Sequence, residues 1–156
     1  MRLEIEPVAP ATVRALRRDL LYPDAPGDGI DYPGDGAPGS VALAAFEGEA
    51  RRLVGTATVL VEAPPRPLGG RVSPAWRLRG VATVPDRRNE GIGTRLVVAA
   101  LEHVAAAGGG LVWCNARLAA RAVYERLGFS ADGEAFELPG VGPHLVMWRS
   151  VAPLGG

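Results

Sequence analysis

The sequence contains no lysine, a single cysteine and only two histidines among its 156 residues. One cysteine excludes an internal disulfide and any metal cluster built from several cysteines, and it is typical of a reducing compartment. Acidic and basic residues number 17 each, and this zero net charge excludes a nonspecific electrostatic grip on nucleic acid or an anionic membrane. The phosphate loop of nucleotide hydrolases ends in Gly-Lys-Ser/Thr, so the absence of lysine also excludes that class of nucleotide site.

Long apolar runs are also missing. No uncharged stretch approaches the ~18 residues of a membrane span, and residues 1–6 lack the apolar segment of a secretion signal. We therefore expect a cytoplasmic protein with no membrane partner, no nucleic-acid partner and no metal site. The length suits a single domain over residues 1–156 with one core.

Hydrophobic patterning predicts a mixed α/β (α+β) chain. One helix follows Pro10, where apolar residues recur at helical spacing, and two more are expected over 91–107 and 118–127. The expected strands cover 3–6, 41–46, 53–61, 76–84, 111–114, 135–138 and 144–149, with a hairpin turn at Gly48 and loops over 22–40 and 62–74. One crossover helix between two strands predicts a mixed sheet of about six or seven strands.

The most informative stretch covers residues 81–93, which read V-A-T-V-P-D-R-R-N-E-G-I-G. An apolar strand runs into a basic, glycine-punctuated turn that opens a helix. The unpaired amides and the positive dipole end of that helix favour an anion, and the missing side chains of Gly91 and Gly93 allow it close to the backbone. The stretch therefore predicts a phosphate site.

A dinucleotide-binding loop fits this stretch poorly. That motif needs G-x-G-x-x-G directly after the strand, whereas Leu96 occupies the third glycine position and residues 85–90 separate the strand from the glycines. The six residues 88–93, R-N-E-G-I-G, instead resemble the acetyl-CoA loop of the GNAT N-acetyltransferases. Residues 122–129, A-V-Y-E-R-L-G-F, resemble a second signature of that family, and the resemblance covers roughly residues 76–149.

The resemblance implies the GNAT fold, in which flanking helices cover a sheet with two splayed central strands, and acetyl-CoA as cosubstrate. It implies that backbone groups of Val81, Ala82 and Thr83 hold the pantetheine arm. It further implies that the pyrophosphate is held by the amides of the turn and the first helical residues, namely Arg88, Asn89, Glu90, Gly91, Ile92, Gly93 and Thr94. The side chain of Arg87 or Arg88 is a further candidate for the pyrophosphate.

Tyr124 is the candidate catalytic residue. In the family this tyrosine commonly protonates the departing CoA thiolate, although its apolar neighbours also suit a core tyrosine. The family function implied is transfer of an acetyl group to a primary amine by direct attack in a ternary complex. The alternative is a noncatalytic CoA-binding or regulatory module on the same fold.

Other candidates stay open at this stage. His144 has a suitable pKa for a general base but also suits a structural role, and Cys114 is either a nucleophile paired with His103 or His144 or an inert buried thiol. Many family members have asparagine seven residues before the tyrosine, where this chain has Arg117. Arg117 or Arg121 could reach the 3′-phosphate of CoA, or both could be solvated.

The acceptor amine is not specified by the sequence. Residues 22–40 combine glycine and proline with four aspartates and no basic residue, which predicts a flexible loop with a negative rim. Such a rim would attract a cationic amine, or the aspartates would serve only to keep the loop soluble. Val146 and Trp148 on a late strand suggest a possible homodimer.

Overall fold

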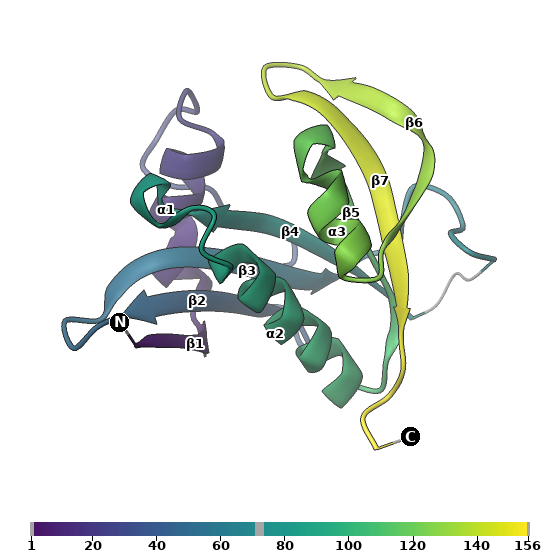
Figure 1. Ribbon diagram of the computed structural model, residues 1–156, viewed down its shortest axis with the longest axis horizontal. Helices are drawn as coiled ribbons and strands as arrows, with labels where there is room; N and C mark the ends of the chain where they lie inside the picture. Colours follow the sequence, from purple (N-terminus) through teal and green to yellow (C-terminus); the bar gives the residue numbers. More distant parts are fainter. Residues whose placement is uncertain (1, 71–73, 156) are drawn as a thin grey trace. The chain divides into compact units, whose positions relative to one another are not determined.

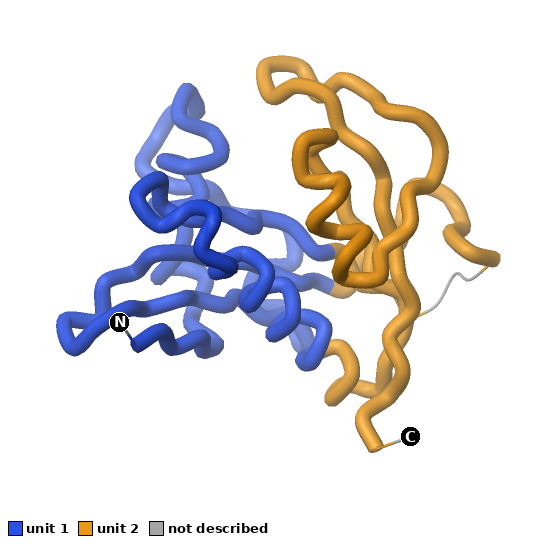
Figure 2. Tube along the Cα trace, in the orientation of Figure 1, with its two compact units in different colours: residues 1–60, 78–103 blue, residues 61–77, 104–156 orange. Residues whose placement is uncertain are grey.

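A computed structural model describes residues 2–70 and 74–155, so the predicted loop over 62–74 lies partly outside the described residues. The chain divides into two compact units, one of Met1–Leu60 and Leu78–His103 and the other of Val61–Arg77 and Val104–Gly156 (Figure 2). Seven strands hydrogen-bond in the order β1-β2-β3-β4-β5-β7-β6, and β4 contributes to both units. This order confirms the predicted mixed sheet.

The first unit contains a meander of three antiparallel strands, β1 (Leu3–Val8), β2 (Val41–Glu47) and β3 (Arg52–Val61) (Figure 1). The predicted hairpin is confirmed, because the N–H of Arg51 donates to the carbonyl of Gly48 at 3.1 Å. The helices are α1 (Pro10–Leu21) and α2 (Ile92–Ala106), close to their predicted positions. None of the helices in the described part of the chain is long and apolar enough to cross a bilayer.

The two helices of this unit cover opposite faces of the strands. Val13 of α1 packs with Ala42 and Ala44 of β2. On β3, a side chain at Gly55 would meet Leu96 and Ile92 of α2 at 3.0–3.2 Å, and Gly55 pairs with Ala45. Because successive residues of a strand point to opposite faces, α1 and α2 cannot share a face. Glycine at position 55 lets α2 lie close to the sheet.

The second unit is built on β5 (Gly110–Arg117), β6 (Ser130–Leu138) and β7 (Gly142–Val151). It also holds the start of β4 (Ala75–Thr83), which pairs with β5 in parallel over three residues only, Ala75–Arg77 with Leu111–Trp113. Parallel pairing confirms the crossover helix, and such a short ladder agrees with central strands that splay.

In this second unit, one face of the sheet carries an apolar cluster, with Phe136 and Trp148 packed against it. The cluster consists of Leu68, Ala75, Leu111, Trp113 and Val146. A side chain at Gly69 would lie 2.4 Å from the Trp148 ring, so position 69 must be glycine. Val146 and Trp148 therefore pack inside their own unit. They no longer supply an exposed apolar surface for the suggested homodimer.

The helix predicted over 118–127 is shorter and less buried than expected. It consists of a 3₁₀ turn, η2 (Leu118–Ala120), followed by α3 (Arg121–Arg126). Tyr124 is its buried residue, whereas Leu118 is 40% exposed. The apolar spacing of this segment was therefore misleading, because most of its small apolar side chains face solvent.

The prediction that the aspartates of loop 22–40 lack opposing bases is wrong. Arg14 of α1 binds Asp28 at 3.0 Å and takes both carboxylate oxygens of Asp31, at 3.0 and 3.1 Å. Arg17 binds both oxygens of Asp35, at 2.7 and 2.9 Å. These ion pairs anchor the loop to α1 and give three of its four aspartates an arginine partner. Two arginine charges offset half of the four negative charges, so the predicted negative rim is weakened.

Arg17 is the largest fully buried side chain in the described part of the molecule. Besides Asp35, its guanidinium donates to Thr58 Oγ1 at 2.9 Å and to the carbonyl of Ile30 at 3.1 Å. A buried charge is tolerated when it is paired and hydrogen-bonded in this way. The loop is thus attached to α1, and through Arg17 to Thr58 of β3, by several hydrogen bonds.

Candidate active site

The turn between β4 and α2 follows the course that the sequence predicts for an anion site. After Thr83 ends β4, the N–H of Val84 donates to the carbonyl of Val54, and a short 3₁₀ turn, η1 (Pro85–Arg87), begins the loop. Asn89 and Gly91 have φ angles of 64° and 83°, in the left-handed region that asparagine tolerates and glycine favours. This backbone path aims the amino end of α2 back at the turn.

The amino end of α2 is open above its two glycines. Arg95 makes the first helical hydrogen bond, from its N–H to the carbonyl of Gly91 at 3.0 Å, so the preceding amides of the first turn lack helical acceptors. A side chain at Gly91 would meet no atom within 4 Å, and one at Gly93 would meet only Thr83 Oγ1 at 3.8 Å. The residues present therefore fit a phosphate group held against the backbone.

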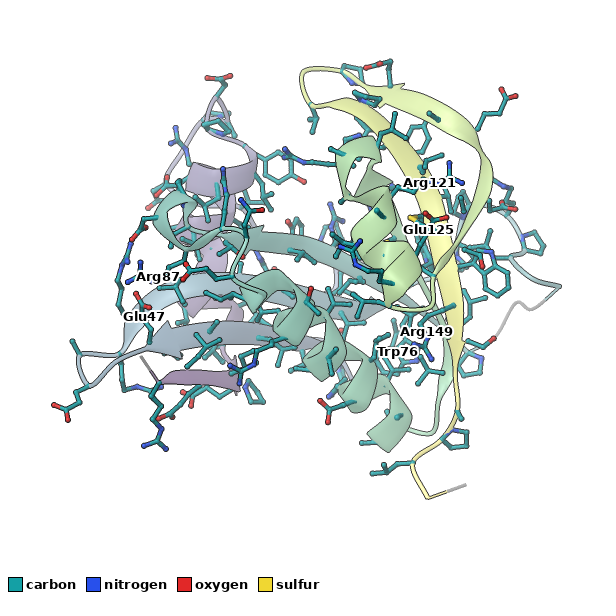
Figure 3. All side chains as sticks on the ribbon, viewed as in Figure 1. Glu47, Trp76, Arg87, Arg121, Glu125 and Arg149 are labelled. Carbon is teal, nitrogen blue, oxygen red and sulfur yellow. The ribbon has the colours of Figure 1, made fainter. Side chains whose placement is uncertain are left out.

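Ion pairs brace this turn against the hairpin of the first unit. Arg52 binds both oxygens of Asp86 at 2.8 Å, and Arg87 binds Glu47 at 2.7 Å (Figure 3). The hydrogen bonds from Arg52 lower the pKa of Asp86 to about 2, and those from Arg87 and then Arg52 lower the pKa of Glu47. Because Arg87 points to Glu47, it serves the turn rather than a bound pyrophosphate.

Arg88 is the remaining basic side chain of the turn. It is exposed, and its Nε donates to the carbonyl of Thr83 at 3.2 Å, which uses one of five guanidinium N–H donors. The carbonyl of Thr83, predicted to hold the pantetheine arm, thus already accepts one hydrogen bond and keeps a second lone pair. Residues 81–83 lie beyond the last pair of the β4–β5 ladder, which ends at Arg77.

Tyr124 lies in the second unit, where α3 places it over β5. Its side chain is 9% exposed and makes an edge-to-face contact with Phe129, with ring centroids 5.3 Å apart. Burial, and secondarily the nearby Cys114, raises the pKa of Tyr124 well above that of a free phenol. At neutral pH the hydroxyl therefore carries its proton, which is the state that a proton donor requires.

The geometry removes Cys114 as a nucleophile. Burial raises the pKa of this thiol to about 12, so the reactive thiolate is scarce at neutral pH. In the β5–β7 ladder Cys114 pairs with Met147, three residues from His144, which places the two side chains on opposite faces of the sheet. His103 is held in the first unit, where its Nε2 lies 2.7 Å from the carbonyl of Gly39.

The same register argues against His144 as the base. Its Nδ1 lies 2.8 Å from the carbonyl of Gly142, and its ring is buried beside Phe136 at a centroid distance of 6.1 Å. Tyr124 lies near Cys114, on the other face of this sheet. His144 and Tyr124 therefore cannot serve one reaction centre, and His144 has the surroundings of a structural histidine.

Comparison with known proteins decides the family. Residues 10–129 match the model of the "Acetyltransferase (GNAT) family". The chain belongs to the GNAT acetyltransferase family. It is 32% identical over 151 residues to a Bacillus subtilis protein named as the uncharacterized N-acetyltransferase YitI, an alignment that covers 96% of this chain and 97% of the relative.

Solved structures share the fold of this GNAT acetyltransferase. Escherichia coli ElaA superposes with a TM-score of 0.72 at 19% identity, covering 95% of this chain and 99% of ElaA. An aminoglycoside 6′-N-acetyltransferase solved with coenzyme A superposes with a TM-score of 0.66 at 19% identity, covering 98% and 99%. The seven-stranded mixed sheet is thus the GNAT fold, as the sequence resemblance implies.

Family membership makes the protein an acyltransferase that uses acetyl-CoA as cosubstrate and an amine as acceptor. Within this GNAT acetyltransferase, Arg121 forms an exposed ion pair with Glu125 at 3.4 Å along α3 (Figure 3). Arg117 is exposed where β5 ends. Neither position reproduces the asparagine found in many members.

The ion pairs that brace the turn between β4 and α2 are not predictable from the sequence. Arg52 and Asp86 are 34 residues apart, and Arg87 and Glu47 are 40 apart, so no local pattern pairs them. A cavity of about 380 Å³ in the first unit, lined by Asp35, Thr58 and residues near the start of α1, was also not anticipated. None of the predicted cofactor residues lines that cavity.

Proposed function

We propose that the protein transfers the acetyl group of acetyl-CoA to a primary amine by direct attack in one ternary complex, without a covalent enzyme intermediate. The observation that carries the proposal is the open amino end of α2, where Asn89 and Gly91 turn the backbone so that free amides face the space above Gly91 and Gly93. The buried, high-pKa thiol of Cys114 supports a route that needs no enzyme nucleophile.

The cofactor-binding set consists of backbone groups rather than side chains. In this proposal residues 89–94 donate their amides to the pyrophosphate, and the helix dipole adds to the attraction. The N–H of Arg88 already donates to the carbonyl of Pro85 at 3.5 Å, so Arg88 contributes its side chain instead. Val81, Ala82 and Thr83 lie past the end of the β4–β5 ladder, so the backbone groups on the side of β4 away from β3 are available to the pantetheine arm. An amide of this strand also stabilises the oxyanion formed during attack.

Tyr124 donates a proton to the departing thiolate. Reference pKa values near 10 for a phenol and 8.5 for a thiol make this transfer uphill by roughly 2 kcal/mol in water. Burial raises the pKa of Tyr124, but it also raises that of the neighbouring thiol Cys114 to about 12. A thiolate that forms in such surroundings is a stronger base than one in water, and so it takes the proton of Tyr124 more readily.

The proposal also covers the domain, its location in the cell and the deprotonation of the amine. Residues 1–156 form one GNAT domain, which works in the cytoplasm, either alone or as a homodimer. The acceptor amine loses its own proton before attack, and no side chain of the second unit is assigned as base. His144 is assigned a structural role.

The test is a screen of amino acids, polyamines, aminoglycosides and peptide amino termini for CoA release, followed by Tyr124→Phe on the best acceptor. The variant keeps the ring that packs on Phe129 and removes only the hydroxyl. We expect kcat to fall roughly 10²-fold while the affinity for acetyl-CoA stays within twofold. Normal turnover by Tyr124→Phe would leave the tyrosine with a packing role alone.

A further inference from the structure

Arg79 of β4 is a cation without an acidic partner among the described residues. Its guanidinium lies 3.9 Å from the centre of the Tyr32 ring, and its Nε is buried with no hydrogen-bond acceptor. The Nε atoms of Arg17 and Arg77 also lack acceptors, but both arginines are ion-paired, Arg17 with Asp35 and Arg77 with Glu62. Arg79 differs from them because its charge has no carboxylate partner among the described residues. A half-buried charge without a counter-charge costs stability, so its retention calls for an explanation such as a ligand.

Tyr32 supplies a second buried polar group at this place. It belongs to the loop after α1 and is 5% exposed. Its hydroxyl makes no hydrogen bond of good geometry in the described part of the chain, and Tyr22 is the neighbouring side chain that interacts with it. Burial and the neighbouring Tyr22 raise the pKa of Tyr32 to about 12, against the opposing effect of Arg79 and Arg17. The hydroxyl therefore keeps its proton at neutral pH and is available as a donor.

Arg79 and Tyr32 lie close to the end of β4, residues 81–83, that is assigned to acetyl-CoA. Gly80 has a φ of 68°, and a side chain there would lie 2.9 Å from the Tyr32 ring, so glycine is what lets Tyr32 sit against the strand. Arg79 is two residues from Val81. At about 3.3 Å per residue, their Cα atoms lie within roughly 7 Å of each other.

The charges around this pair favour an anion. Asp28, Asp31 and Asp35 of the same loop are already engaged by Arg14 and Arg17, and Arg79 has no ion pair with any carboxylate among the described residues. A guanidinium and a phenol hydroxyl together present several N–H and O–H donors and no strong acceptor. Carboxylate and phosphate oxygens are the groups that such a set recognises.

We propose that Arg79 and Tyr32 bind an anionic group of the acceptor, so that the substrate is an amine that also carries a carboxylate or a phosphate. This inference rests on the proposed acetyl transfer, and it names the substrate class of that site. Arg79 selects acceptors that carry a negative group, and the hydroxyl of Tyr32 holds that group next to β4.

Matched acceptors test the proposal. We expect an amino acid to be acetylated more efficiently than its amide, which lacks the carboxylate, or phosphoethanolamine more efficiently than ethanolamine. Arg79→Gln should raise the KM for the acceptor with the anionic group roughly tenfold to a hundredfold, while the KM values for the acceptor without it and for acetyl-CoA stay unchanged. Arg79→Lys should recover part of the loss, and Tyr32→Phe should raise the same KM several-fold.

A binding measurement makes the proposal independent of turnover. Acetate and inorganic phosphate, titrated separately into the free protein, should shift the backbone NMR signals of Tyr32 and Gly80 saturably, and the stronger of the two identifies the anion. Arg79→Gln should abolish these shifts, whereas Arg2→Gln, at an exposed site, should not. Absence of such shifts, or equal KM values for matched acceptors, overturns this inference and leaves acetyl transfer standing. Shifts without acetylation of any amine would instead refute the proposed function.

Discussion

Two irregular segments of the first unit, the loop over 22–40 and the turn over 84–91, are held in different ways. The turn is shaped by its own backbone, since Asn89 and Gly91 adopt left-handed φ angles that direct the chain into α2. The loop is held by side chains from another element, because Arg14 and Arg17 of α1 bind its aspartates. A segment shaped locally can be predicted from its own residues, and a segment anchored from a distance cannot.

The two segments also differ in which of their polar groups remain free to bind a ligand. In the turn, arginine and acid pairs such as Arg52–Asp86 lie on the hairpin side and leave the backbone amides to a ligand. In the loop, the carboxylates that the sequence suggests as a recognition surface are instead bound by Arg14 and Arg17. Charged residues counted along a loop therefore say little about its net field until their partners are known.

The largest effect is expected from breaking the anchor of the loop. Arg17→Met leaves the carboxylate of Asp35, 11% exposed, with only the N–H of Tyr32. We expect a loss of about 3 kcal/mol in the free energy of unfolding, the lower end of the range for a broken buried pair, measured by urea denaturation.

A double variant controls this experiment. Arg17→Met combined with Asp35→Leu removes both charges and should recover most of the stability lost by Arg17→Met alone, because no unpaired carboxylate remains. A single variant as stable as the parent would show that the loop does not depend on this anchor.

The next largest effect tests the backbone of the turn. Gly93→Asp adds a carboxylate where the pyrophosphate is proposed to bind, and a side chain there has room because its nearest contact is Thr83 Oγ1 at 3.8 Å. Acetyl-CoA should bind at least tenfold more weakly in calorimetric titration, a change of about 1.4 kcal/mol. Gly93→Asn has the same size without the charge and should lose less. Equal affinities for parent and Gly93→Asp would remove α2 from the cofactor site.

Much of the fold follows from local patterns. The apolar spacing from Ile92 to Val104 predicts α2, and the alternation around Gly48 predicts the β2–β3 hairpin, because both depend on one buried face. Strand β6 was expected to begin near 135 but begins at Ser130. It lies at the edge of the sheet beside β7, and none of its residues is fully buried. Its first half therefore lacks the apolar alternation by which strands are recognised.

Only the part of the site that consists of backbone groups could be predicted from the sequence. The motif over 88–93 identifies the turn because glycine positions and a helix start are local properties. Arg17 was missed although it lies four residues after Val13 on the buried face of α1, where a charge signals a distant partner. The contact of Arg79 with the Tyr32 ring joins positions 47 residues apart in the sequence and depends on the fold itself.

A smaller effect should appear in the pH dependence of stability. Burial alone would raise the pKa of Asp35, but the bonds from Arg17 and from the N–H of Tyr32 outweigh it and hold this pKa below 3.8. The unfolded chain therefore binds more protons in acid, and the contribution of Asp35 is present above about pH 4 and lost as the pH falls through its lowered pKa. Urea midpoints measured between pH 6 and pH 2.5 should decline less steeply for Asp35→Asn than for the parent. Asp24→Asn is the matched control and should keep the parent slope.

The smallest effect is expected from Asp31→Asn, which asks whether the loop recognises a cationic amine after all. Arg14 already takes both oxygens of Asp31, on the surface of the molecule, so little of its field remains for a substrate. Arg14 also keeps Asp28 at 3.0 Å when Asp31 is neutralised, so the variant should stay folded. We therefore expect the KM of a cationic amine to change by less than twofold at low salt, with no change in the KM for acetyl-CoA. A several-fold rise in the amine KM that fades as salt is added would restore the loop as an electrostatic rim, because only an unscreened carboxylate responds to ionic strength in that way.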